Sequence, residues 1–167
     1  MRNIIMALVA TVVFIGCSSD STVERIVEPK LVVGKSLADL SLNNEFDKAQ
    51  TLNETSTKVI FAFSKDMAHI CNDFFVTQSA TYLGENNTQF VADVSAAPSI
   101  IRNMFIIPGL KDFKHTVLVL NDENVAASYR AGSEVDKIVV VYVENKTITK
   151  ILTVSTQDEL KKIIQTK

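Results

Sequence analysis

Hydrophobic positions after residue 58 alternate between short continuous runs and helical stripes. Residues 59–63 are all apolar, which is typical of a buried parallel strand. Residues 64–84 predict a helix, because their apolar positions recur at spacings of three and four and Ser64 or Asp66 can cap the start. Residues 88–94 predict the next strand. Residues 98–107 predict a second helix, whose expected buried stripe consists of Ile100, Ile101, Met104 and Phe105.

The second half of the chain reads as two hairpins and a closing helix. Pro108 and Gly109 are expected to end the helix before them. Residues 116–120 and 125–129 predict one antiparallel hairpin around a turn at 121–124, and residues 138–143 and 147–154 predict another. A last helix is expected to begin at Ser155 or Thr156, with acidic residues in its first turn. Either hairpin can complete the central sheet.

The first seventeen residues have the layout of an export signal. Arg2 precedes an apolar run at 4–15, which is too short to span a bilayer, since that needs roughly 20 apolar residues. The run ends in Gly16-Cys17 and resembles a lipobox, which implies cleavage before Cys17 and a lipid on its thiol. The alternatives are an ordinary cleaved signal and an uncleaved anchor. Ser18 is compatible with sorting to the outer membrane, so we expect a periplasm-facing lipoprotein of that membrane.

Composition supports one domain behind a tether. Residues 18–30 are polar and contain Pro29, so they predict a flexible tether, and residues 31–167 predict a single domain. The chain carries a formal net charge of −2, which becomes −3 if Arg2 is removed with the signal. That balance indicates neither nucleic acid nor an anionic membrane as an electrostatic partner. The expected partners are the membrane, through the lipid, and a protein of the cell envelope.

The order of elements resembles a thioredoxin. Residues 33–42 are similar to the segment that leads into the sheet of envelope thioredoxin-like and peroxiredoxin-like proteins. Residues 90–95 and 115–120 are similar to strands in the second half of that fold. The resemblance implies an α/β, thioredoxin-like domain with a central mixed sheet flanked by helices, extended by a C-terminal hairpin and helix.

The residues that such proteins use for thiol chemistry are missing. Thioredoxin-like oxidoreductases carry Cys-x-x-Cys at the start of the helix after the first central strand. The corresponding residues 65–71 of this chain include a single cysteine, Cys71. With Cys17 bound to lipid, Cys71 has no partner in the chain, so dithiol exchange is excluded. The family's cis-proline, expected before residues 116–120, is replaced by His115, for which a trans bond is predicted.

Three readings of the remaining residues stay open. Met67, Cys71 and His115 resemble the ligand positions of Sco-type copper proteins, and a thioether, a thiolate and an imidazole suit Cu(I), with Asp66 and His69 as neighbours. Alternatively, Met67 and Cys71 are ordinary core residues. A third reading makes Cys71 the nucleophile of a peroxidase-type enzyme with His69 or His115 as base. The preferred interpretation is a redox-inactive binding or accessory module without a certain cofactor.

Overall fold

One mixed sheet of seven strands organises the domain in the computed structural model, which describes residues 27–166. The strand order is β2-β1-β5-β4-β3-β6-β7. The three central strands are parallel and nearly fully buried, as the apolar run at 59–63 predicts for the first of them. They are β3 (Lys58–Ala62), β4 (Thr88–Asp93) and β5 (Leu118–Leu120). The predicted thioredoxin-like α/β architecture is confirmed.

Antiparallel hairpins complete both edges of the sheet. The hairpin of β1 (Ser41–Asn44) and β2 (Ala49–Thr51) pairs with β5 on one side. The hairpin of β6 (Ile138–Glu144) and β7 (Thr147–Val154) pairs with β3 on the other. Of the two hairpins that the sequence predicts, the C-terminal one is therefore the one that joins the central sheet beside β3.

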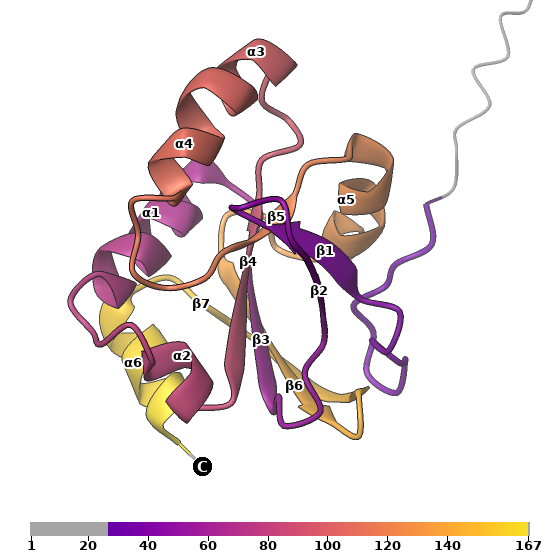
Figure 1. Cartoon of the computed structure of the whole chain (residues 1–167). Coiled ribbons are helices and arrows are strands. Elements are labelled where there is room, and N and C mark those ends of the chain that lie inside the picture. Colours follow the sequence, from indigo (N-terminus) through magenta and orange to yellow (C-terminus); the bar gives the residue numbers. More distant parts are fainter. Residues whose placement is uncertain (1–26, 167) are drawn as a thin grey trace, which may run out of the picture.

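Helices cover both faces of the sheet (Figure 1). Along β3, Val59 and Phe61 face a core under α5 (Glu123–Arg130), whereas Ile60 and Ala62 face a core under α1 (Lys65–Phe75) and α6 (Gln157–Gln165). This alternation is the two-residue period of a strand buried on both faces. Lys58 closes the lower end of the second core, because its Nζ donates to the Thr166 carbonyl at 2.8 Å, just after α6.

Residues 125–129 form a helix, so the predicted first hairpin is wrong. Asp122 occupies the position before α5 and its side chain accepts the backbone N–H groups of Asn124 and Val125 at 2.8 and 3.1 Å. Glu123 in the first turn and Arg130 in the last turn also suit the helix dipole. These polar residues favour a capped helix over a turn between two strands.

The helix predicted over residues 64–84 is interrupted. α1 ends at Phe75, and a short helix, α2 (Tyr82–Glu85), follows after a turn. The interruption has a local cause, because Thr77 donates both its backbone N–H and its hydroxyl to the Phe74 carbonyl, at 3.2 and 2.7 Å. Those bonds tighten the chain into a turn and replace the next helical bond.

The second predicted helix exists, but the stripe expected to be buried faces solvent. It consists of α3 (Ser99–Ile101), the π-helical turn η1 (Arg102–Ile106) and α4 (Ile107–Leu110), so Pro108 lies inside it. In the π-helical turn, the Ile107 N–H donates to the Arg102 carbonyl five residues back. Leu110 is buried, whereas the four side chains of the predicted stripe are 45% to 68% exposed. The four are Ile100, Ile101, Met104 and Phe105.

Candidate functional site

The start of α1 lies at the carboxyl end of β3, where thioredoxin-like oxidoreductases carry their cysteines. Ser64 caps this helix by accepting the Met67 backbone N–H at 3.4 Å. Asp66 and His69 are exposed on the first two turns, and Met67 is half-buried against the core under α1. The helix start is therefore intact, but its first turn presents a thioether and no thiol.

Cys71 lies one helical turn deeper and is fully buried. It belongs to the apolar cluster of Phe74, Phe75 and Phe90, and burial raises the pKa of its thiol far above the ordinary value. A thiol in this environment stays protonated at neutral pH, and the thiolate is the form that attacks substrates and binds metals. The position favours a packing role for Cys71 over the role of a nucleophile or ligand.

His115 is enclosed by aromatic rings, and its side chain makes one hydrogen bond. Its Nε2 lies 2.9 Å from Asn72 Oδ1, and its ring stacks on Phe113 and meets Phe75 edge-on, each with centroids 5.1 Å apart. Among the described residues Nδ1 has no hydrogen-bond partner. Burial lowers the pKa of His115 to about 4, so the ring is neutral near pH 7.

Two of the three residues of the copper hypothesis, Met67 and His115, lie near opposite ends of the parallel strands. His115 precedes β5 at the amino end of the parallel strands and contacts the second half of α1, whereas Met67 lies in the first turn of α1 at the carboxyl end. Among residues 27–166, no group of three or more His, Cys, Asp and Glu side chains is placed to hold a metal ion. Copper binding through Met67, Cys71 and His115 stays a prediction.

His115 does not occupy the cis-proline position that the sequence predicts for it. The strand that pairs antiparallel with the central strand β3 is β6, so the residue before that strand is Lys137, and His115 instead precedes β5. Between residues 27 and 166 no peptide bond is cis. The difference arises because residues 125–129, predicted as the strand after β5, belong to the helix α5.

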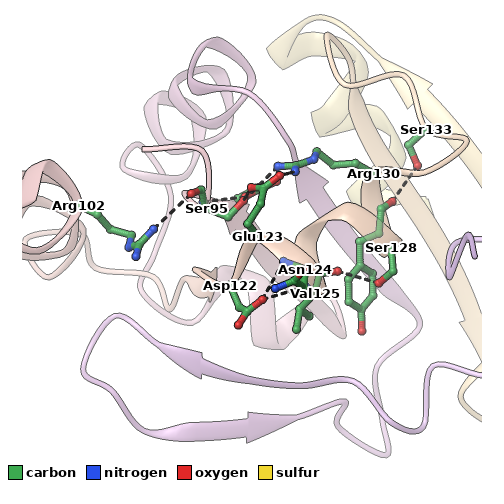
Figure 2. Close-up of polar contacts among 11 residues, drawn as sticks. Ser95, Arg102, Asp122, Glu123, Asn124, Val125, Ser128, Arg130 and Ser133 are labelled. Carbon is green, nitrogen blue, oxygen red and sulfur yellow. Dashed lines mark hydrogen bonds and ion pairs between the residues drawn. The ribbon is translucent and has the colours of Figure 1, made fainter. Parts of the chain in front are cut away.

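A polar network occupies the carboxyl end of β4 instead (Figure 2). The Asp93 carboxylate, whose side chain is 1% exposed, pairs with Arg130 Nη1 at 2.8 Å and accepts the Ser95 hydroxyl at 2.6 Å. Arg130 Nη2 also pairs with Glu123, and Arg102 donates to the Ser95 carbonyl at 3.3 Å. The network joins α5 and the helix at 99–110 to the end of β4. Asp93 and Glu123 are both paired with Arg130, which indicates a structural role.

Sequence reasoning missed this network. Asp93 lies near the end of the predicted strand 88–94, and polar groups gather at such positions because parallel strands end together at one edge of a sheet. The pairing of Arg130 with both Asp93 and Glu123 does not follow from the sequence pattern, because that pattern predicts a turn at Glu123 and ends the following strand before Arg130. They come together only because residues 123–130 are helical.

Comparisons with known proteins identify the fold and no closer relationship. No family model matches the sequence, and no curated protein matches it. A solved structure of a disulfide isomerase homologue from Bacteroides thetaiotaomicron is similar over 80% of this chain and 86% of its own, with 13% identity and a TM-score of 0.51. Peroxidoxin BcpB from Mycobacterium tuberculosis covers 79% of this chain and 93% of its own, with 15% identity and a TM-score of 0.51.

A third solved structure, a peroxiredoxin-like protein from Aquifex aeolicus, covers 83% of this chain and 89% of its own, with 13% identity and a TM-score of 0.50. At these identities the similarity concerns the fold. The chain has a thioredoxin-like fold of the kind found in disulfide oxidoreductases and peroxiredoxins.

Proposed function

We propose that this thioredoxin-like chain is a lipid-anchored protein of the cell envelope that acts as a binding or accessory module without thiol redox activity. The observation that carries the proposal is the state of Cys71. It is the only cysteine outside the predicted lipid site, and it is fully buried with a raised thiol pKa. A dithiol exchange needs a second thiol, and a peroxidase needs an accessible thiolate.

The anchoring part of the proposal depends on Cys17, which lies outside the described residues together with the whole predicted signal and most of the tether. Its support is the short apolar run and the Gly16-Cys17 junction. Within residues 27–166, no helix is both long and apolar enough to cross a membrane. An N-terminal lipid is then the proposed means of attachment, and the periplasmic face of the outer membrane the proposed location.

The last residues of the predicted tether contact the domain. Lys30 pairs with Asp39 at 2.7 Å, and its backbone N–H donates to the Ser128 carbonyl at 2.8 Å. Lys30 Nζ also lies 5.2 Å from the centre of the Tyr129 ring. The proposed tether therefore ends beside α5, so the domain would be connected to the lipid from this side.

Separate measurements test the anchor and the absence of redox activity. Mass spectrometry of the protein from membranes is expected to find Cys17 lipidated at the new N-terminus, and Cys17→Ser should release the protein from the membrane fraction. The native chain should leave a disulfide substrate such as insulin unreduced, and Cys71 should react with a thiol reagent only after unfolding, as fast as a free cysteine. Rapid reaction of native Cys71, or reduction of the disulfide, would contradict the redox-inactive assignment.

A further inference from the structure

The exposed side of the helix at residues 99–110 is an apolar surface that the fold does not use. Ile100, Ile101, Met104 and Phe105 are spaced by one, three and four residues, which places them along one side of a helix. Ile100 is 68% exposed, and Met104 and Phe105 are each 64% exposed. We call these four residues the apolar ridge. A cluster of large apolar side chains in solvent on one element marks an interaction surface.

The segment that carries the apolar ridge and the turn after it is basic. Residues 99–114 contain Arg102, Lys111 and Lys114 against the single acid Asp112, a local charge of +2 in a chain whose total is −2. Lys111 and Lys114 are exposed beyond the end of α4, where Lys111 Nζ lies 6.0 Å from the centre of the Phe46 ring. Arg102 is half-buried and donates to the Ser95 and Ala97 carbonyls, so its charge has no carboxylate partner within residues 27–166. Residues 99–114 are therefore positively charged although the net charge of the whole chain is negative. An apolar helical face with basic neighbours fits the boundary between the anionic headgroups and acyl chains of a bilayer.

The chain enters the described domain where the ridge can reach a membrane. α3 and α5 stand at the same end of the sheet (Figure 1), and the chain arrives beside α5, where Lys30 bonds to Ser128. The ten residue steps from Cys17 to Val27 can span at most about 36 Å. A domain of this size has a radius of gyration of about 14 Å. The predicted tether is therefore long enough for the ridge to touch the bilayer that holds the lipid.

We propose that the apolar ridge inserts into the interfacial layer of a phospholipid bilayer carrying anionic headgroups, so that the domain lies on the membrane surface. This inference rests on the proposed lipid anchor and adds a second contact with the same membrane. A symmetric dimer through the ridge is the competing occupant. A two-fold contact through the ridge would bring two copies of a basic segment together, and contacts between like charges oppose association.

The test uses the chain from residue 18, which lacks Cys17 but retains both core clusters, since these lie between Leu31 and Ile164. Sedimentation is measured with vesicles of roughly three parts phosphatidylethanolamine to one part phosphatidylglycerol, and with vesicles of phosphatidylcholine alone. We expect binding to the anionic vesicles that weakens in high salt. Ile100→Ser/Phe105→Ser should lower the partition coefficient at least about tenfold.

The matched control is Val33→Ser/Val135→Ser, which removes two exposed apolar side chains elsewhere, 59% and 44% exposed, and should leave binding unchanged. The inference is overturned if the unchanged chain does not bind anionic vesicles, if both double variants bind equally, or if the chain without vesicles is a dimer that the ridge variant dissociates. Lipidated Cys17 together with no vesicle binding would overturn this inference alone. Vesicle binding with an unmodified Cys17 would overturn the anchor and leave the ridge contact.

Discussion

Buried His115 makes the stability of this domain depend on pH in a direction that its surroundings determine. The ring is 3% exposed, and with Asn72 Oδ1 as acceptor the neutral ring carries its proton on Nε2. Protonation at Nδ1 would then place a charged donor in an aromatic enclosure where no described residue accepts it. The folded protein therefore resists protonation of His115, and its pKa falls from 6.5 to about 4.

The sign follows from proton binding in the two states. Below pH 6.5 His115 is protonated in the unfolded chain but stays neutral in the folded protein. The free energy of unfolding therefore decreases as the pH falls from 6.5 to about 4. The contribution of this residue should decrease by about 2 kcal/mol between pH 7 and pH 5, and by about 3 kcal/mol between pH 7 and pH 4. Above pH 6.5 the contribution is constant.

Urea unfolding at pH 7 and pH 5 measures the effect, because pH 5 lies above the titration of most carboxylates. His115→Gln is expected to be less stable than the unchanged chain at pH 7, but to lose about 2 kcal/mol less between the two pH values. The control His69→Gln, at an exposed site on α1, should keep the full decrease. If His115→Gln loses as much stability as the unchanged chain, the argument from burial is refuted.

Three further substitutions test the packing and the network. Arg130→Ala should lower the free energy of unfolding by about 2 to 3 kcal/mol, because it leaves the buried Asp93 carboxylate unpaired, and calorimetry at pH 7 should show it. Lys58→Met should cost about 1 kcal/mol in denaturant unfolding, because the carbonyl groups after α6 lose their charged donor; an unchanged midpoint would refute this. Cys71→Ser should cost about 1 to 3 kcal/mol by burying a hydroxyl group, and more than Cys71→Ala if no acceptor is nearby.

The sequence pattern was sufficient to locate the central strands and to predict helices between them, although the first of these helices is interrupted after Phe75 and the second continues past Pro108. Fully apolar runs such as 59–63 have few alternatives to a buried parallel strand, and the three-and-four spacing of Met67, Cys71 and Phe74 matches α1. The loss of the dithiol motif was also visible in the sequence, because it depends only on which residues are present. The thioredoxin-like fold followed from the order of these elements.

Tertiary structure alone decided where those elements face and which residues meet. A helical pattern shows that Ile100, Ile101, Met104 and Phe105 share a side, but not whether another element covers that side. Residues 125–129 suit either a strand or a helix, and the choice depends on the Asp122 cap and on packing against the sheet. The location of His115 depends on which hairpin pairs with β3. Strand pairing joins residues far apart in the chain, and local periodicity carries no information about such contacts.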